Sequence, residues 1–298
     1  MKEEKRIFCF GDSFTVGEGA NLKLQSEIEL MFSQDSSSRR QAAEIISEIS
    51  KKLSWTKHIG DHFGIWTANY GETGSTNNKI FNNVFTVEAM HNGFTSDDLI
   101  IIMWSSSIRD KLSWFPALFS DQGPVGAGWS LKELLYKDSV EAFEKRYYQD
   151  TLEKKELEYV QTKLTPFLKD YFKTYLTSLH SNEYYNLLNL NYIKLLQEYF
   201  VTNSIPYIMV DAFECMNSFK AKKDTKWEKL IDTRYYFGEG NTTVWDELDK
   251  IGGDVWEDPE FSFHPPGQRC HPNAEGYKLI GDMLIDFISR KIWTPKLF

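Results

Sequence analysis

Cysteine is scarce in this sequence, and its scarcity excludes several kinds of protein. There are three cysteines in 298 residues: Cys9, Cys215 and Cys270. An odd, sparse count argues against a disulfide framework, and no pair has the short spacing of metal ligands. The lysine-containing glycine loop that cradles phosphates is also missing. We therefore expect a reducing compartment, no metal and no cofactor, with Cys9 and Cys215 buried in their apolar runs.

Long apolar runs and long basic runs are missing as well. No apolar stretch approaches the roughly 20 residues that a membrane span needs. The charged N-terminus leads directly into a short apolar run with no secretory h-region, so we expect no signal peptide. The net charge is −9, and the basic cluster at 220–223 is short. Because binding to nucleic acid needs a basic face, we expect no nucleic-acid partner, no membrane association and a cytoplasmic location.

Aromatic residues, in contrast, are abundant at 15% of the chain. Burial in a large core explains such a content, and so does a groove that binds sugars. Composition alone does not separate the two.

Apolar runs alternate along the chain with segments of helical periodicity. Strands are expected at 7–10, 65–69, 99–104 and 206–213, and helices at 41–63, 77–90, 182–203 and 274–292. The serines at 36–38 are expected in a loop or N-cap, and 214–260 in a short strand and loops. This alternation predicts an α/β fold with three layers, α/β/α, built on a parallel sheet. We expect one domain over 1–298, with a mostly helical insertion at about 111–185.

Three loops at the carboxyl ends of the expected strands carry residues suited to nucleophilic catalysis. Ser13 follows the first strand, Gly74 the second and Ser106 the third, and these ends meet at one edge of a parallel sheet. His271 precedes the last helix at the same edge. A serine nucleophile needs a base and donors for the developing oxyanion, and a neutral imidazole suits the base. Ser13 and His271 are the preferred pair, with His264 as a competing base and a simple N-cap as the alternative role of the Asp-Ser pair.

Three short motifs resemble those of the SGNH, or GDSL-type, hydrolases. They are GDSFTVGEG at 11–19, NYGETGSTN at 69–77 and HPNAEGY at 271–277. The resemblance implies a flavodoxin-like sheet and hydrolysis of an acyl ester. It also implies that Ser13 is the nucleophile, that His271 is the base and that the amide of Gly74 belongs to the oxyanion hole.

The third family motif is altered in this chain. The family has a glycine and an asparagine after the third strand, whereas this chain reads WSSSIR at 104–109. Ser106 stands at the place of the asparagine, and Asn77 of the second loop is expected to compensate as an oxyanion donor. Arg109 either binds an anionic substrate group or caps a helix at the surface. Loss of one oxyanion donor costs about 10²–10³ in rate.

The last motif departs as well, because the aspartate that the family has three residues before the histidine is Gln268 here. A glutamine side chain can bind the imidazole but cannot stabilise its protonated form as a carboxylate does. The residues left as candidates to orient the histidine or bind substrate are Asp12, Gln268, Arg109, Asp254, Glu257 and Asp258. A backbone carbonyl or a plain serine–histidine dyad are the other possibilities.

Two classes of function fit these observations. The first is an esterase or deacetylase acting on a small-molecule or carbohydrate ester, with acyl transfer to a sugar hydroxyl not separated from hydrolysis. The second is a catalytically degenerate binding or structural protein. The first is the preferred interpretation, and the altered motifs are the reason to keep the second as the alternative. The Trp-Ser end of the third strand resembles phage- and marine-type hydrolase-like proteins, and on that resemblance the alternative includes a viral or particle-associated role.

Overall fold

The protein is described by a computed structural model that covers residues 5–21, 24, 27–28, 36–106, 182–213, 231–252, 255–256 and 271–292. The chain divides into two compact units, residues 1–106 with 190–298, and residues 107–189. The expected helical insertion at about 111–185 lies almost wholly outside the described residues. All further structural statements concern the first unit.

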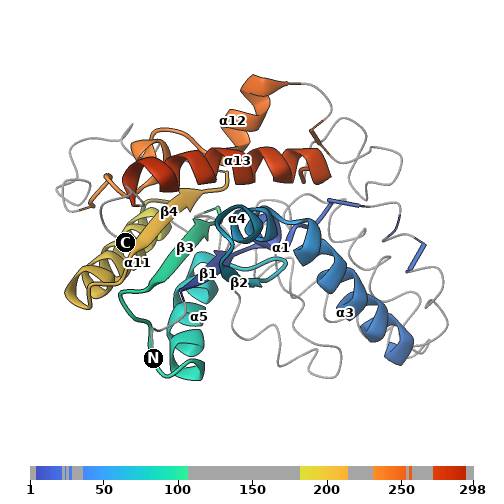
Figure 1. The fold of residues 1–298 in the computed structure, drawn as a ribbon, viewed down its shortest axis with the longest axis horizontal. Coiled ribbons are helices and arrows are strands. Elements are labelled where there is room, and N and C mark those ends of the chain that lie inside the picture. The colour runs from blue at the N-terminus through green and yellow to red at the C-terminus, as the bar shows by residue number, and fades with distance from the viewer. Residues whose placement is uncertain are drawn as a thin grey trace, which may run out of the picture. The chain divides into compact units, whose positions relative to one another are not determined.

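Four parallel strands form the sheet of this unit. They are β1 (Arg6–Gly11), β2 (Trp66–Gly71), β3 (Asp98–Trp104) and β4 (Tyr207–Asp211), in the spatial order β2-β1-β3-β4 (Figure 1). All three pairings are parallel. The expected strands are therefore confirmed, and their carboxyl ends share one edge.

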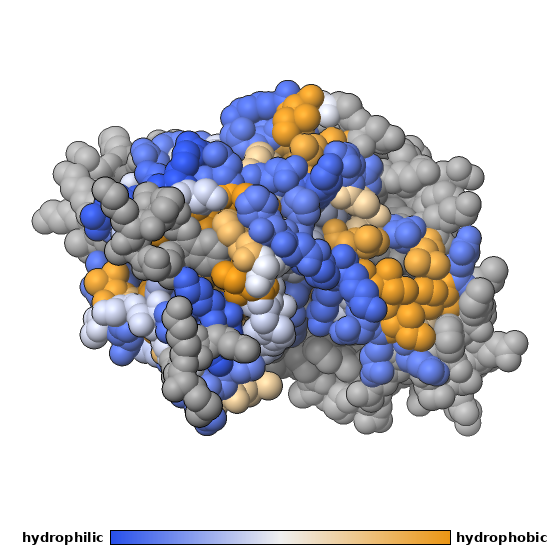
Figure 2. Space-filling view, viewed as in Figure 1, coloured by the Kyte–Doolittle hydropathy of each residue, from blue (hydrophilic) through white to orange (hydrophobic). Residues whose placement is uncertain are grey.

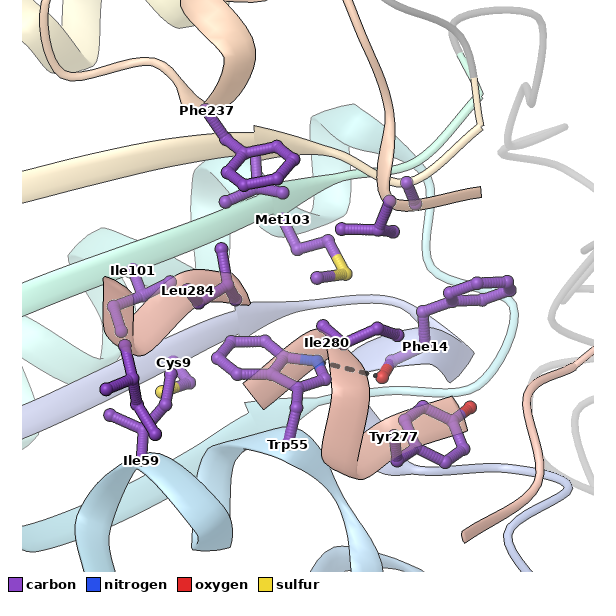
Figure 3. Close-up of a cluster of buried hydrophobic side chains, with 14 of the residues drawn as sticks. Cys9, Phe14, Trp55, Ile59, Ile101, Met103, Phe237, Tyr277, Ile280 and Leu284 are labelled. Atoms are coloured by element: carbon purple, nitrogen blue, oxygen red, sulfur yellow. Dashed lines mark hydrogen bonds between the residues drawn. The ribbon is translucent and has the colours of Figure 1, made fainter. Parts of the chain in front are cut away.

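Helices cover both faces of the sheet, which confirms the three-layer architecture. Along β1, Ile7 and Cys9 pack on one face while Phe8 and Phe10 pack on the other. The first face is covered by α1 (Ser13–Val16), α4 (Trp55–Phe63), α12 (Val244–Ile251) and α13 (Ala274–Lys291), as Figure 3 shows in part. The second is covered by α5 (Asn77–Met90) and by the part of α11 (Asn182–Thr202) that lies in this unit.

The helix expected over 41–63 is two helices, which corrects the prediction. They are α3 (Ser36–Leu53) and α4, and the serines at 36–38 belong to α3 rather than to a loop. Ser54 separates them because its backbone is extended and its side chain caps α4, accepting a hydrogen bond from the amide of Thr56. Figure 2 shows hydrophobic residues gathered at the right of the view, where Figure 1 places α3, with a hydrophilic band beside them.

Met90 shares a helix face with Ile80, Val84 and Val87, which are buried, but 68% of Met90 is exposed. One further prediction needs correction. The stretch 214–260 was expected to hold loops and a short strand, whereas its described part forms α12 and a short 3-10 helix at Phe237–Gly240. Thr243 and Asp246 start α12 with a capping box, a signal that was present in the sequence.

The structure shows where the described cysteine and many of the aromatic side chains lie. Cys9 is fully buried, and burial raises the pKa of its thiol well above the usual value. Cys215 and Cys270 lie outside the described residues. Many of the aromatic side chains belong to the two core clusters, Trp55 and Trp104 being fully buried. Among the helices that the structure describes, none has the length and apolar character that crossing a membrane requires.

Candidate active site

Ser13 begins a short helix directly after the first strand. The side chain of Asp12 caps this helix by accepting a hydrogen bond from the amide of Phe14 at 3.0 Å. Gly17 ends it in the left-handed conformation, with φ of 93°, which favours glycine. The expected N-cap role of the Asp-Ser pair is therefore real, and it places Ser13 at the carboxyl edge of the sheet.

Side chains from neighbouring elements donate hydrogen bonds to the backbone carbonyl groups of α1. The indole of Trp55 donates to the carbonyl of Phe14 at 3.0 Å, which Figure 3 marks with a dashed line. The hydroxyl of Ser54 and the amide of Asn69 donate to the carbonyl of Thr15 at 2.8 and 2.6 Å. Because a helix of four residues has few hydrogen bonds of its own, these contacts hold the helix that carries Ser13.

His271 is held at the start of α13 by a short antiparallel contact. Pro272 forms a bridge with Trp256, and the amide of Asn273 donates to the carbonyl of Val255 at 3.0 Å. Asn273 then caps α13. A Cβ atom at Gly276 would lie 2.2 Å from the carbonyl oxygen of Val255, so this close approach requires glycine.

The two elements bring the predicted nucleophile and base together. Nε2 of His271 lies 3.0 Å from Oγ of Ser13, which is hydrogen-bond distance for a serine and its general base. Ser13 is 3% exposed, and the ring of Phe14 lies 5.7 Å from the imidazole ring. This is an activated-serine arrangement, in which the imidazole can take the hydroxyl proton as Oγ attacks an electrophile.

A buried hydrogen-bond network joins this site to the end of β3. The hydroxyl of Ser105 donates to Oδ2 of Asp12 at 2.6 Å. Asn77 accepts from the amide of Ser105 at 2.8 Å and donates to its carbonyl at 2.9 Å. Asn77 was expected to donate to the oxyanion. Its carboxamide binds the Ser105 backbone and so positions the segment that leads to Ser106, and its donor role stays a prediction.

The remaining oxyanion candidates lie on the same edge. Gly74 follows β2 in a turn, with φ of 70°, and the strand residue Gly71 pairs with Gly11 immediately before Asp12. Ser106 follows Ser105 at the end of β3 and is partly buried. Their donor roles stay predictions. Six other candidates lie outside the described residues, so the roles expected of them also stay predictions: Gln268, Arg109, Asp254, Glu257, Asp258 and His264.

Sequence reasoning missed one acidic residue of the site. Oε2 of Glu18 lies 3.9 Å from Nε2 of His271. The signal was an acidic side chain between two glycines, five residues after Ser13, and its proximity to the histidine depended on the tertiary fold.

Other groups in the described part of the chain lie away from this chemistry. His58 binds Asp282 at 2.8 Å and His91 binds the hydroxyl of Tyr70 at 2.7 Å, as expected of structural histidines. No cluster of three or more histidine, cysteine or acidic side chains that could hold a metal occurs among the described residues. A cavity of about 630 Å³, lined by Lys5, Phe200, Tyr207 and Lys291 among others, lies at the amino edge of the sheet.

Fold and site together define an α/β protein with a serine–histidine pair at the carboxyl edge of a parallel sheet. No protein-family model matches the chain, and no curated protein is similar to it in sequence. A solved structure from Desulfitobacterium hafniense DCB-2 aligns with 95% of this chain and 99% of its own, at 14% identity and a TM-score of 0.39. One from Veillonella parvula DSM 2008 aligns with 96% and 98%, at 14% identity and a TM-score of 0.40. The first is described as a "putative lipolytic protein of G-D-S-L family" and the second as a "member of the lipolytic protein G-D-S-L family".

Proposed function

We propose that this protein is a serine hydrolase that cleaves an acyl ester through Ser13 and His271. The observation that carries the proposal is the 3.0 Å contact between Oγ of Ser13 and Nε2 of His271. The two residues are 258 positions apart in the chain, and each lies in a motif that resembles the same family.

The proposed reaction passes through an acyl-enzyme. Oγ of Ser13 attacks the ester carbonyl while its proton moves to Nε2 of His271. The imidazolium returns that proton to the leaving alcohol as the ester C–O bond breaks. Water then attacks the acyl group and gives a proton to His271, and the proton returns to Oγ as the acid leaves. Donors at Gly74 and Ser106 stabilise the oxyanion in this scheme.

The substrate class is the finer part of the proposal. The first substrate to test is an O-acetylated carbohydrate, in which the acyl group is acetyl and the alcohol is a sugar hydroxyl. The burial of Trp55 and Trp104 weakens the compositional argument for a sugar groove, because these aromatic side chains serve the core. A sugar hydroxyl in place of water makes the same chemistry an acyl transfer.

Labelling and turnover test the proposal together. The protein is incubated with a fluorophosphonate and, separately, with p-nitrophenyl acetate, beside Ser13→Ala. Ser96→Ala serves as the matched control, since Ser96 is an exposed serine at the opposite edge of the sheet. We expect phosphonate on the Ser13 peptide, and a loss of kcat of about 10³-fold or more in Ser13→Ala alone. No labelling together with equal rates in all three proteins would favour the degenerate binding protein.

A further inference from the structure

The carboxylate of Glu18 lies beside the catalytic pair without a hydrogen bond to another described residue. Its Oε2 atom is buried and lies 3.9 Å from Nε2 of His271, the same nitrogen that contacts Ser13. A buried carboxylate oxygen normally accepts hydrogen bonds, and leaving it without one is costly. Its charge is therefore available to the imidazole.

The two elements that carry Ser13 and His271 also hold the backbone of Glu18. Its amide donates to the carbonyl of Ser13 at 3.1 Å, and its carbonyl accepts from the hydroxyl of Tyr277 at 2.7 Å. Gly17 and Gly19 on either side have φ values of 93° and 86°. These hydrogen bonds and the two glycines hold the loop at 17–19 in a turn that places Glu18 close to His271.

The chemistry of the pair calls for a negative charge near the imidazole. His271 becomes a cation each time it takes a proton, and a carboxylate about 4 Å away lowers the free energy of that cation. The family resemblance expects an aspartate where this chain has Gln268. At 3.9 Å, Glu18 acts on the imidazole through its charge rather than through a hydrogen bond.

Among the described residues, the groups that lie near His271 come from α1, the loop after it and α13. Helix α1 contributes the hydroxyl of Ser13 and the ring of Phe14, and the following loop contributes Glu18. On α13 the nearest charged side chain in sequence is Glu275, which is 59% exposed and pairs with Lys278. Of the two acidic side chains, Glu18 is the one that contacts the imidazole.

We propose that Glu18 is a positioning residue that stabilises the protonated form of His271 and takes the place of the aspartate expected near Gln268. This proposal rests on the proposed hydrolase function and deepens it.

The variants Glu18→Gln, Glu18→Asp and the control Glu275→Gln separate charge from shape. Glu18→Gln keeps the size of the side chain and removes its charge, whereas Glu18→Asp keeps the charge. We expect kcat/KM at its plateau to fall about tenfold in Glu18→Gln, less in Glu18→Asp and not at all in Glu275→Gln. The acid limb of the kcat/KM profile should move to lower pH in Glu18→Gln alone, which a purely structural role would not produce. Thermal melting verifies that each variant is folded.

A histidine NMR titration makes the proposal independent of activity. With labelled histidine, and with His271→Ala to assign the signal, the titration midpoint of His271 should move to lower pH in Glu18→Gln and stay in place in Glu275→Gln. An unchanged midpoint in Glu18→Gln overturns the role of Glu18, even where Ser13→Ala abolishes turnover. An inactive wild type with a shifted midpoint overturns the hydrolase function and leaves the electrostatic pair in place.

Discussion

Asp98 lies at the amino edge of the sheet and Glu18 lies at the carboxyl edge, and the surroundings of the two carboxylates differ. Asp98 accepts from Arg6 at 2.7 and 2.8 Å and from the amide of Thr95 at 2.7 Å. The Glu18 oxygen nearest His271 has no such donor among the described residues. A carboxylate that accepts permanent hydrogen bonds stabilises the fold. A carboxylate oxygen without such donors can instead stabilise a positive charge that forms beside it.

The carboxyl edge contains a satisfied carboxylate as well, so the difference is not one of location alone. Asp12 accepts from the amide of Phe14 and from the hydroxyl of Ser105. These contacts fix the backbone around Ser13, and Asp12 is fully buried. Asp12 therefore stabilises the backbone beside Ser13, whereas Glu18 lies 3.9 Å from Nε2 of His271.

The largest effect that distinguishes the two edges is expected for His271→Ala. Removing the base should lower kcat for p-nitrophenyl acetate by about 10³-fold or more, with little change in the free energy of unfolding. His58→Ala is the matched control, because His58 binds Asp282 on the outer side of α4 and α13. Equal losses in the two variants would contradict the assignment of the base.

Arg6→Met should show the reverse behaviour, a loss of stability without a loss of rate. The Asp98 side chain is fully buried, so removing its partner leaves a buried charge and should cost about 3 kcal/mol in the free energy of unfolding. Urea titration measures the cost, and kcat of the folded protein should be unchanged. Arg6→Met combined with Asp98→Asn should recover part of the loss, and a further loss in that double variant would show that the ion pair is not the cause.

Ser105→Ala tests how much the hydrogen bond between Ser105 and Asp12 contributes to stability. It removes the donor to Asp12 and should lower the free energy of unfolding by about 1–3 kcal/mol. A double-mutant cycle with Asp12→Asn measures the coupling between the two side chains. If the two losses simply add, the 2.6 Å contact contributes nothing to stability.

The smallest effect is expected for the exposed pair Asp232–Arg234. A hydrogen bond from the Arg234 side chain lowers the pKa of Asp232, so its contribution exists above the ordinary aspartate pKa and is lost as the pH falls through the lowered value. Arg234 is 76% exposed, and solvent screens the pair. Asp232→Asn should therefore change the urea midpoint at pH 7 only marginally and abolish a small difference between pH 7 and pH 3. A loss comparable to that of Arg6→Met would contradict the role given to burial.

Much of the fold was predictable from local patterns. The run LIIIMW at 99–104 is apolar throughout because both faces of β3 are covered, and α5 begins and ends where the periodicity of 77–90 predicted. The break at Ser54 was not predicted, although a serine that caps the following helix is a local signal, and the contact of its hydroxyl with the carbonyl of Thr15 depends on the tertiary fold. Met90 fits the helical period, but it comes at the last turn of α5, where no element packs against it closely enough to bury it.

In the site, too, some features were predictable from local sequence patterns and others depended on tertiary contacts. Ser13 and His271 were predicted from their motifs and from the rule that parallel strands end at one edge, and the structure brings them together. Asn77 was predicted as an oxyanion donor because it is an amide in the right loop. Its donor role stays a prediction, while its hydrogen bonds to the Ser105 backbone, which depend on the packing of α5 against the end of β3, could not be predicted from the sequence.

By itself the sequence determined the α/β architecture, the edge of the sheet that carries the serine and the identity of the serine and the histidine. These depend on apolar periodicity and turn residues, which act over a few positions in the chain. Only the tertiary structure decided which acidic side chain faces the imidazole and which amide binds backbone. Such choices depend on contacts between elements distant in the chain: the loop after α1 approaches α13 in the case of Glu18, and α5 packs against the end of β3 in the case of Asn77.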